Sequence, residues 1–157
     1  MAYEIVRDGP SRSFPDGDAF LDGAVPGGDV LLYLGTPPAT VIPDESRKAV
    51  LVELGTESLG VHTGESAGEE GSNVVGFARY RNGDDPPSAL IELIRQPASD
   101  ASAIEAAKAM FEEAGFTVCV CSDQPGRIVD RLVRPKYNAA LRFLDEGLAT
   151  AKDMDLT

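Results

Sequence analysis

The sequence predicts an α/β domain with a mixed parallel and antiparallel sheet, followed by one long helix. Two observations lead to this expectation. Short apolar runs bounded by Gly, Pro, Asp or Ser clusters recur along the chain, as is typical of strands. Apolar residues at helical spacing gather in the second half, where helices alternate with the last strands. With 157 residues, 43% of them hydrophobic, the chain is long enough to bury one core.

Six apolar runs are the expected strands. They cover residues 2–6, 29–35, 48–54, 73–80, 88–95 and 116–123. "PDGDAFLDGAV" and "PDESRKAV" each leave room for one short helix or helical turn, and residues 60–72 and 81–87 are loops by composition. The chain closes in the order strand, strand, helix, strand, helix, so the last strands need not all be parallel.

Two stretches carry a helical pattern. In residues 99–115, Ser99 or Asp100 is the expected N-cap and Gly115 the expected C-cap. The final stretch opens at Pro125 and is expected to run to the end of the chain. Its apolar stripe consists of Leu132, Val133, Tyr137, Ala140, Leu141, Leu144 and Leu148. We expect this stripe to cause self-association, and the alternative is that the helix folds back on the sheet.

The composition excludes several classes of partner. A net charge of −12 repels phosphate backbones and anionic lipid surfaces, so nucleic acid and membrane partners are not expected. No apolar run reaches the length of a membrane span, and "MAYEIVRDGP" lacks the features of a signal peptide, so a cytoplasmic protein is expected. Cys119 and Cys121 are expected to be reduced thiols on one strand face. A C-x-C metal site is the alternative, but His62 is the only histidine.

The segment "GFTVCVCSDQPGRIVDRLVRPKYNAALRFLDEGLATAKDMDLT" resembles the interdomain junction of the 3-hydroxyacyl-CoA dehydrogenase family. There a strand leads into D-x-P-G-F-I-x-N-R, then into a long helix with N-E-A and E-G-V-A, then into an Asp-Ile/Leu-Asp element. The matching residues are Asp123, Pro125, Gly126, Ile128, Val129, Arg131, Asn138, Ala139, Ala140, Glu146, Gly147, Ala149, Asp153 and Asp155. Further back, "LIELIR", "VVGFARY" and "LVELGTESLGV" resemble the family's V-E-V-I, G-x-H-F-F-N-P and N-T-S-S-L segments.

This resemblance implies a degenerate, truncated Rossmann-like sheet over residues 1–122. Residues 123–157 would be the junction and the first helix of an incomplete C-terminal helical domain. The family reaction uses NAD, whose pyrophosphate needs a Gly-rich turn that opens a helix after the first strand. "RDGPSRSFPDGD" has no such spacing, so no cofactor is expected for this chain, and no metal site is expected either.

The resemblance also assigns the positions of the family's reacting groups. The general base of the family, a His, falls on Ala78, and its partner carboxylate falls on Glu92. The substrate-orienting Ser and Asn fall on Glu57 and Asp130. Added carboxylates oppose a developing oxyanion. Glu92 is therefore expected to be a catalytic remnant that has another partner, with Arg95 and Arg79 as the candidates.

Three functions follow from this comparison. The first is a non-catalytic module with a scaffold or dimer-interface role, which forms a homodimer or joins a complete dehydrogenase half through the helix 127–150. The second is an active dehydrogenase of acyl-CoA thioesters with an atypical site of Glu92, His62 and Ser58. The third is an acyl-CoA-binding module without turnover, in which Arg127, Arg131, Arg134 and Ser58 hold the ligand.

Overall fold

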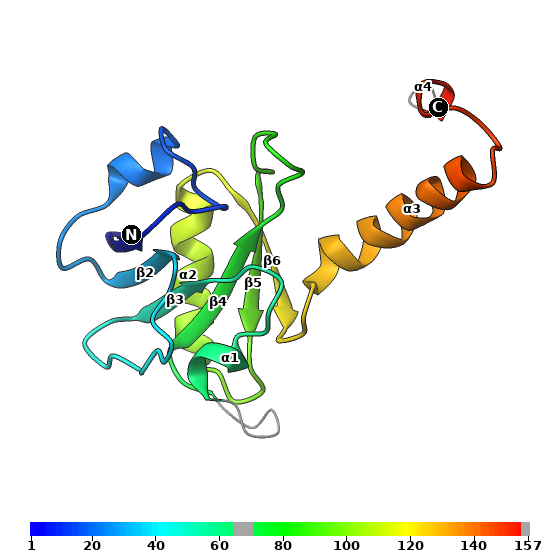
Figure 1. The fold of residues 1–157 in the computed structure, drawn as a ribbon. Helices are drawn as coiled ribbons and strands as arrows, with labels where there is room; N and C mark the ends of the chain where they lie inside the picture. Colours follow the sequence, from blue (N-terminus) through cyan, green and yellow to red (C-terminus); the bar gives the residue numbers. More distant parts are fainter. Residues whose placement is uncertain (65–70, 155–157) are drawn as a thin grey trace. The chain divides into compact units, whose positions relative to one another are not determined.

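The computed structural model of this protein describes residues 1–64 and 71–154, and within them one sheet of six strands (Figure 1). The strands are β1 (Tyr3–Asp8), β2 (Val30–Gly35), β3 (Ala49–Glu53), β4 (Val74–Arg79), β5 (Leu90–Arg95) and β6 (Thr117–Ser122). The helices are η1 (Ala19–Gly23, a 3-10 helix), α1 (Gly60–Thr63), α2 (Ala101–Glu113), α3 (Arg127–Asp145) and α4 (Ala151–Met154). Asp155, the last residue of the family-like junction, lies outside the described residues.

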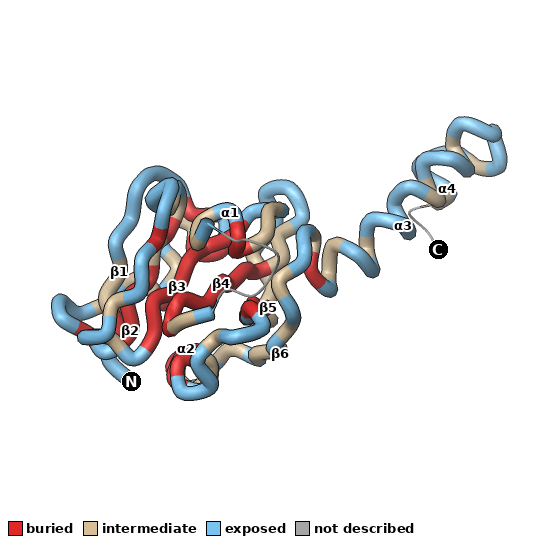
Figure 2. Tube along the Cα trace, turned by 90° about the horizontal axis from the view of Figure 1, so that it is seen from below, coloured by how far each residue is buried: buried red, intermediate tan, exposed pale blue. Residues whose placement is uncertain are grey.

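The strands follow one another across the sheet in sequence order, from β1 to β6. β1 to β4 are parallel, β5 runs antiparallel to β4, and β6 is parallel to β5. The mixed sheet predicted from the closing order of elements is therefore confirmed. β3 and β4 are buried along their whole length, which explains why their sequences are nearly continuous apolar runs (Figure 2).

Each face of the sheet has its own core. On the first face, α2 packs with an aromatic cluster from the segment that links β1 to β2. Phe14 stacks on Phe20 with ring centroids 4.3 Å apart, and Phe14 and Phe20 both contact Phe111 of α2. On the second face, the link from β2 to β3 and the link after β3 cover the sheet with Val41, Leu54 and Leu59. Glu92 of the candidate site alternates with Ile94 of this core along β5, so it lies on the same face.

Of three local expectations, one is confirmed and two need correction. The segment 15–25 holds the short helix expected there, the five-residue 3-10 helix η1, capped by Asp18, whose carboxylate accepts from the backbone N–H of Phe20. No helix forms over 43–50, because Asp44 holds a turn by accepting from the N–H and the hydroxyl of Ser46. The short helix α1 stands where a loop was expected, and residues 65–70 of that loop lie outside the described part of the chain.

The chain divides into two compact units, Met1–Arg127 and Ile128–Thr157. In the second unit, α3 contains Pro135 and ends at Asp145, so the expected helix stops before the end of the chain. The stop occurs at Gly147, whose positive φ of 69° suits a residue without a side chain. Among residues 1–64 and 71–154, no helix has the length and apolar character that crossing a membrane requires.

Candidate functional site

Glu92 is a buried carboxylate on the second face of the sheet. It lies in β5, and in the antiparallel ladder its partner on β4 is Ala78. Directly opposed residues project to the same face, so the Ala78 methyl and the Glu92 carboxylate are neighbours. Glu92 is only 4% exposed. The structure thus brings together the two positions at which the resemblance places the family's base and its partner, and the first holds no proton-transferring group.

Arg127, the first residue of α3, supplies the cation for Glu92. Its Nε atom lies 3.8 Å from Glu92 Oε2, and both side chains are almost fully buried. Its two terminal nitrogens donate to the backbone carbonyls of Glu57 (3.0 Å) and Gly55. Nε itself has no hydrogen-bond partner, so the contact with Glu92 is an ion pair. Arg79, one of the two partners expected for Glu92, is bound elsewhere, whereas Arg127 was expected to hold substrate.

The backbone around Arg127 is held in an unusual conformation. Arg127 has a φ of 40°, the one positive φ among the described non-glycine residues. Such a conformation costs about 1–2 kcal/mol for a residue with a side chain. The surrounding contacts offset that cost. Gly126 N–H donates to Thr56 O, and the Asp123 carboxylate accepts from the N–H groups of Leu59 and Gly60 at 2.7 and 2.9 Å. The junction 123–127 is therefore fastened to the link that follows β3.

Glu57 and His62 form a second polar pair on this link. Nε2 of His62 lies 3.5 Å from Oε1 of Glu57, and Gly55 N–H donates to the same oxygen at 2.9 Å. Burial by itself would raise the pKa of Glu57. The hydrogen bonds from its own N–H, from Gly55 and from His62 outweigh burial, so the pKa of Glu57 lies below its usual value of 4.5. Glu57 is therefore an anion at neutral pH, as the sequence analysis assumed.

Both cysteines are free and half-buried in β6, and β6 aligns Cys119 with Glu92. Burial, followed by the nearby negative charge of Glu92, raises the pKa of the Cys121 thiol to about 11. The same two causes raise the pKa of Cys119. At neutral pH both are therefore thiols, which are poor nucleophiles and poor metal ligands. The described part of the chain contains no cluster of three or more metal-ligating side chains.

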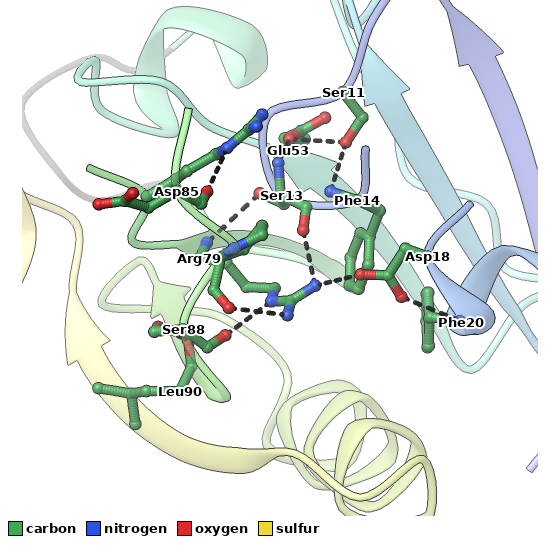
Figure 3. A network of polar contacts seen from close by, with 12 residues as sticks. Ser11, Ser13, Phe14, Asp18, Phe20, Glu53, Arg79, Asp85, Ser88 and Leu90 are labelled. Carbon is green, nitrogen blue, oxygen red and sulfur yellow. Dashed lines mark hydrogen bonds and ion pairs between the residues drawn. The ribbon is translucent and has the colours of Figure 1, made fainter. Parts of the chain in front are cut away.

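A second polar network lies at the carboxyl ends of β2, β3 and β4 (Figure 3). Glu53, the last residue of β3, is buried, and its carboxylate accepts three hydrogen bonds. The donors are Ser11 Oγ (3.0 Å), Ser13 N (2.7 Å) and Gly35 N (2.7 Å). Gly35 has a φ of 82°, and a side chain there would collide with the Asp8 carbonyl. These bonds hold residues 9–13 against the sheet.

Arg79, the last residue of β4, completes this network (Figure 3). Its guanidinium donates to Ser13 O (2.7 Å), to the Asp18 carboxylate (2.8 Å) and to Ser88 O (2.9 Å). It also lies over the Phe14 ring, 5.0 Å from the centroid. The segment 9–18 thus covers the carboxyl ends of the parallel strands with the chain's own side chains.

The residues present do not fit a dinucleotide. In open α/β sheets such ligands bind beyond the carboxyl ends of the strands, where the strand order reverses. Here the order runs without reversal from β1 to β6, and residues 9–18 occupy the carboxyl ends. Between β1 and β2, the 3-10 helix η1 stands where a phosphate-binding helix would begin, and its five residues are too short for that role.

The remaining residues of the expected site are distributed over both units. Ser58 is half-buried on the link after β3. Asp130 is half-buried in α3, where Arg131 and Arg134 are exposed, and all three belong to the second unit. The structural roles of Asp123, Glu53 and Arg79 were not predicted: Asp123 was only one of the residues matching the family motif, and Arg79 was only a candidate partner of Glu92. A charged residue at the end of an apolar strand was the available signal for Glu53 and Arg79.

The first prediction concerns the buried ion pair. Arg127→Met removes the guanidinium that pairs with the buried Glu92, and we expect the free energy of unfolding to fall by about 3–5 kcal/mol. Adding Glu92→Leu removes the buried carboxylate as well, so the double variant should lose about 1–3 kcal/mol less than the two single losses combined. Urea unfolding of the four proteins measures this coupling. Arg134→Met, an exposed position of the same helix, is the control, and additive losses would contradict the pairing.

The second prediction concerns Glu57. Because its folded pKa lies below 4.5, the ionised carboxylate stabilises the fold above pH 4.5, and this stabilisation is lost as pH falls through the folded pKa. Glu57→Gln should therefore be less stable than the wild type at pH 7, by about 0.5 kcal/mol because the group is partly exposed. Thermal unfolding from pH 7 to pH 3 should show the difference vanish, whereas Glu45→Gln should show none. A pH-independent difference would refute this assignment.

No family profile matches the chain, but curated proteins do. The chain is 37% identical over 70 residues to the 3-hydroxybutyryl-CoA dehydrogenase of Bradyrhizobium diazoefficiens, which is 45% of this chain and 24% of that protein. The enzyme of the same name from Mycobacterium tuberculosis is 37% identical over 75 residues, 45% of this chain and 25% of that one. The chain thus aligns with about a quarter of the length of these relatives.

The fold agrees with these relatives. The solved (S)-3-hydroxybutyryl-CoA dehydrogenase PaaH1 from Ralstonia eutropha superposes with a TM-score of 0.61 over 80% of this chain and 46% of that one, at 20% identity. Because the two sequences are only 20% identical, this superposition shows a shared fold, which is Rossmann-like. The sequence matches agree with the motifs read from the sequence, and over these residues they support the resemblance to the 3-hydroxyacyl-CoA dehydrogenases.

Proposed function

We propose that this chain is a non-catalytic module of a 3-hydroxyacyl-CoA dehydrogenase, with a scaffold or interface role. The observation that carries the proposal is the pairing of Glu92. Opposite it in the ladder stands Ala78, which cannot accept a proton, and the cation that meets it is Arg127. A carboxylate held by a buried guanidinium does not orient a base. The chain keeps the position of the reacting pair and uses it for stability.

The covered carboxyl edge of the sheet supports the same proposal. Glu53 and Arg79 hold residues 9–18 in place by hydrogen bonds from buried partners. A nucleotide could enter only if these bonds broke and Phe14, which is fully buried, left the core. Such a rearrangement exposes apolar surface and unpairs buried polar groups, both of which are unfavourable. We therefore propose that this chain binds no NAD.

The scaffold role rests on α3. It presents exposed apolar side chains along its length, and Leu132 is 73% exposed and Leu141 59%. An amphipathic helix with an apolar side of this extent is stable in water chiefly when another surface covers that side. We propose that a complete dehydrogenase half covers it. Association with a second copy through α3 is the other arrangement consistent with the sequence, and a cytoplasmic location stays a prediction.

Acyl-CoA binding without turnover is the second candidate, and one observation favours it. Arg131, Arg134 and Lys136 are exposed on α3, and they lie close together on a chain whose first 126 residues carry 8 Lys and Arg against 21 Asp and Glu. Such a cluster suits the phosphates of CoA. Arg127, which the sequence analysis included in this group, is buried against Glu92. The atypical enzyme has less support, because Glu92 is inaccessible and engaged.

The third prediction tests catalysis and cofactor binding together. With acetoacetyl-CoA and NADH, the purified chain should oxidise no NADH above the buffer rate, and calorimetric titration with NAD should give no heat. A complete 3-hydroxybutyryl-CoA dehydrogenase serves as the positive control. Turnover or saturable NAD binding would refute the proposal. Titration with acetoacetyl-CoA separates the second candidate, since saturable binding that is lost in Arg131→Ala plus Arg134→Ala would favour a binding module.

The fourth prediction tests the apolar side of α3. Leu132→Glu together with Leu141→Glu should abolish co-sedimentation of the chain with a complete dehydrogenase encoded by the same genome, without changing the circular dichroism of the fold. Asn138→Glu adds the same charge at another exposed position of the helix and should leave co-sedimentation intact. Equal binding by wild type and the double variant would exclude α3 as the docking surface.

A further inference from the structure

The two outer strands of the sheet are protected very differently. β1 carries Glu4, Arg7 and Asp8, and part of its outer side is occupied, because Val25 N–H donates to Tyr3 O at 2.8 Å. Charged residues and local cover are the usual means by which edge strands avoid pairing with other chains. β6, at the other edge, reads TVCVCS and contains no charged residue and no proline. The edge at β6 therefore lacks the usual protection.

The outer side of β6 presents free backbone groups. Thr117 N–H donates to Ala89 O, just before β5, and Asp123 N–H donates to Arg95 O at the end of β5, so the odd-numbered residues face β5. In a parallel ladder the N–H and C=O of alternate residues point the other way, which leaves those of Val118, Val120 and Ser122 on the outer side. Within the described part of the chain, the structure gives these groups no hydrogen-bond partner. The Val120 side chain is 40% exposed.

We propose that β6 pairs with β6 of a second copy of this chain, antiparallel, about a two-fold axis at Val120. Identical strands related by such an axis must run antiparallel, and the contact closes as a dimer. With the axis there, Val120 exchanges both of its backbone hydrogen bonds with Val120 of the second copy. Val118 does the same with Ser122 of the second copy. All outward groups of the strand then have partners, and the exposed valines cover each other.

A second copy is the occupant that we propose, because β6 is the edge of the sheet at which two acidic copies can meet without opposing charged residues. The chain carries a net charge of −12, so two copies repel each other wherever acidic surfaces meet. β6 is neutral along its whole length, so pairing there brings no like charges into direct opposition across the strands. More distant charges are screened beyond about 8 Å at physiological ionic strength. The proposed pairing uses residues of β6 and none of α3, so it extends the proposed scaffold role without depending on it.

The proposed register places the two cysteines of each chain opposite those of the other. Cys119 falls across from Cys121 of the second copy in a non-hydrogen-bonded pair, where Cα atoms are about 4.5 Å apart. That separation lies within the range a disulfide spans, about 4.4–6.8 Å. Shifting the register by two residues in either direction would instead oppose Cys119 with Cys119, or Cys121 with Cys121. Single-cysteine variants therefore report the register directly.

The fifth prediction is a cross-linking experiment on the full chain. Cys119→Ser retains only Cys121 and Cys121→Ser retains only Cys119, so a mixture can form the proposed bridge and neither variant alone can. The oxidant is diamide, and the pH is about 9, because the raised pKa of Cys121 (about 11) leaves little thiolate at neutral pH. The two thiols form one disulfide, and their two protons and two electrons reduce the diamide to its hydrazine. Non-reducing electrophoresis should show at least about tenfold more covalent dimer in the mixture. Equal yields, or none in the mixture, would overturn the register.

Analytical sedimentation, which measures the oligomeric state, is a second and independent test. All proteins carry Leu132→Glu and Leu141→Glu, so that association through α3 does not contribute. We expect a dimer that Val120→Lys weakens by at least about tenfold and that Val6→Lys, an equally exposed valine on β1, leaves unchanged. The proposal would be overturned if the protein that carries only Leu132→Glu and Leu141→Glu is a monomer at every concentration. It would also be overturned if Val120→Lys leaves the dimer unchanged.

Discussion

A carboxylate can be buried beneath a sheet only where a cation or several donors meet it, and this constraint decides the layout of the first unit. Glu92 is met by Arg127, and the same guanidinium also holds the carbonyls of Gly55 and Glu57. One side chain thereby fastens three parts of the chain that are far apart in sequence: β5, the link after β3, and the start of α3. The strained backbone of Arg127 persists because these contacts over-determine it.

On the other face of the sheet, the buried carboxylate of Glu53 is stabilised by neutral hydrogen-bond donors instead of a cation. Its three hydrogen bonds draw residues 9–13 over the carboxyl ends of the strands, and Arg79 holds the residues that follow. In its relatives' fold this edge is the expected place for a ligand, because parallel strands end there. Here it is part of the core. The same buried charges that stabilise this chain are therefore the features that argue against catalysis.

Much of the architecture could be predicted because it depends on local pattern. The six strands and α2 follow from apolar runs and helical spacing, and the order of the last elements indicated that not all strands need be parallel. The predictions failed where local signals compete. Residues 44–47 form a turn because the Asp44 side chain accepts from the backbone N–H of Ser46, and α3 ends early because Gly147 adopts a positive φ.

The sequence by itself determined the resemblance to the dehydrogenases, the alanine at position 78 where that resemblance places a base, and the absence of a Gly-rich turn, since each depends only on which residue stands where. Only the tertiary structure decided what replaces the lost chemistry. The partner of Glu92 is neither Arg79 nor Arg95 but Arg127, which comes within 3.8 Å through the pairing of β5 with β6 and the turn at Asp123. Ion pairs act over a few ångströms in space, and sequence separation does not measure that distance.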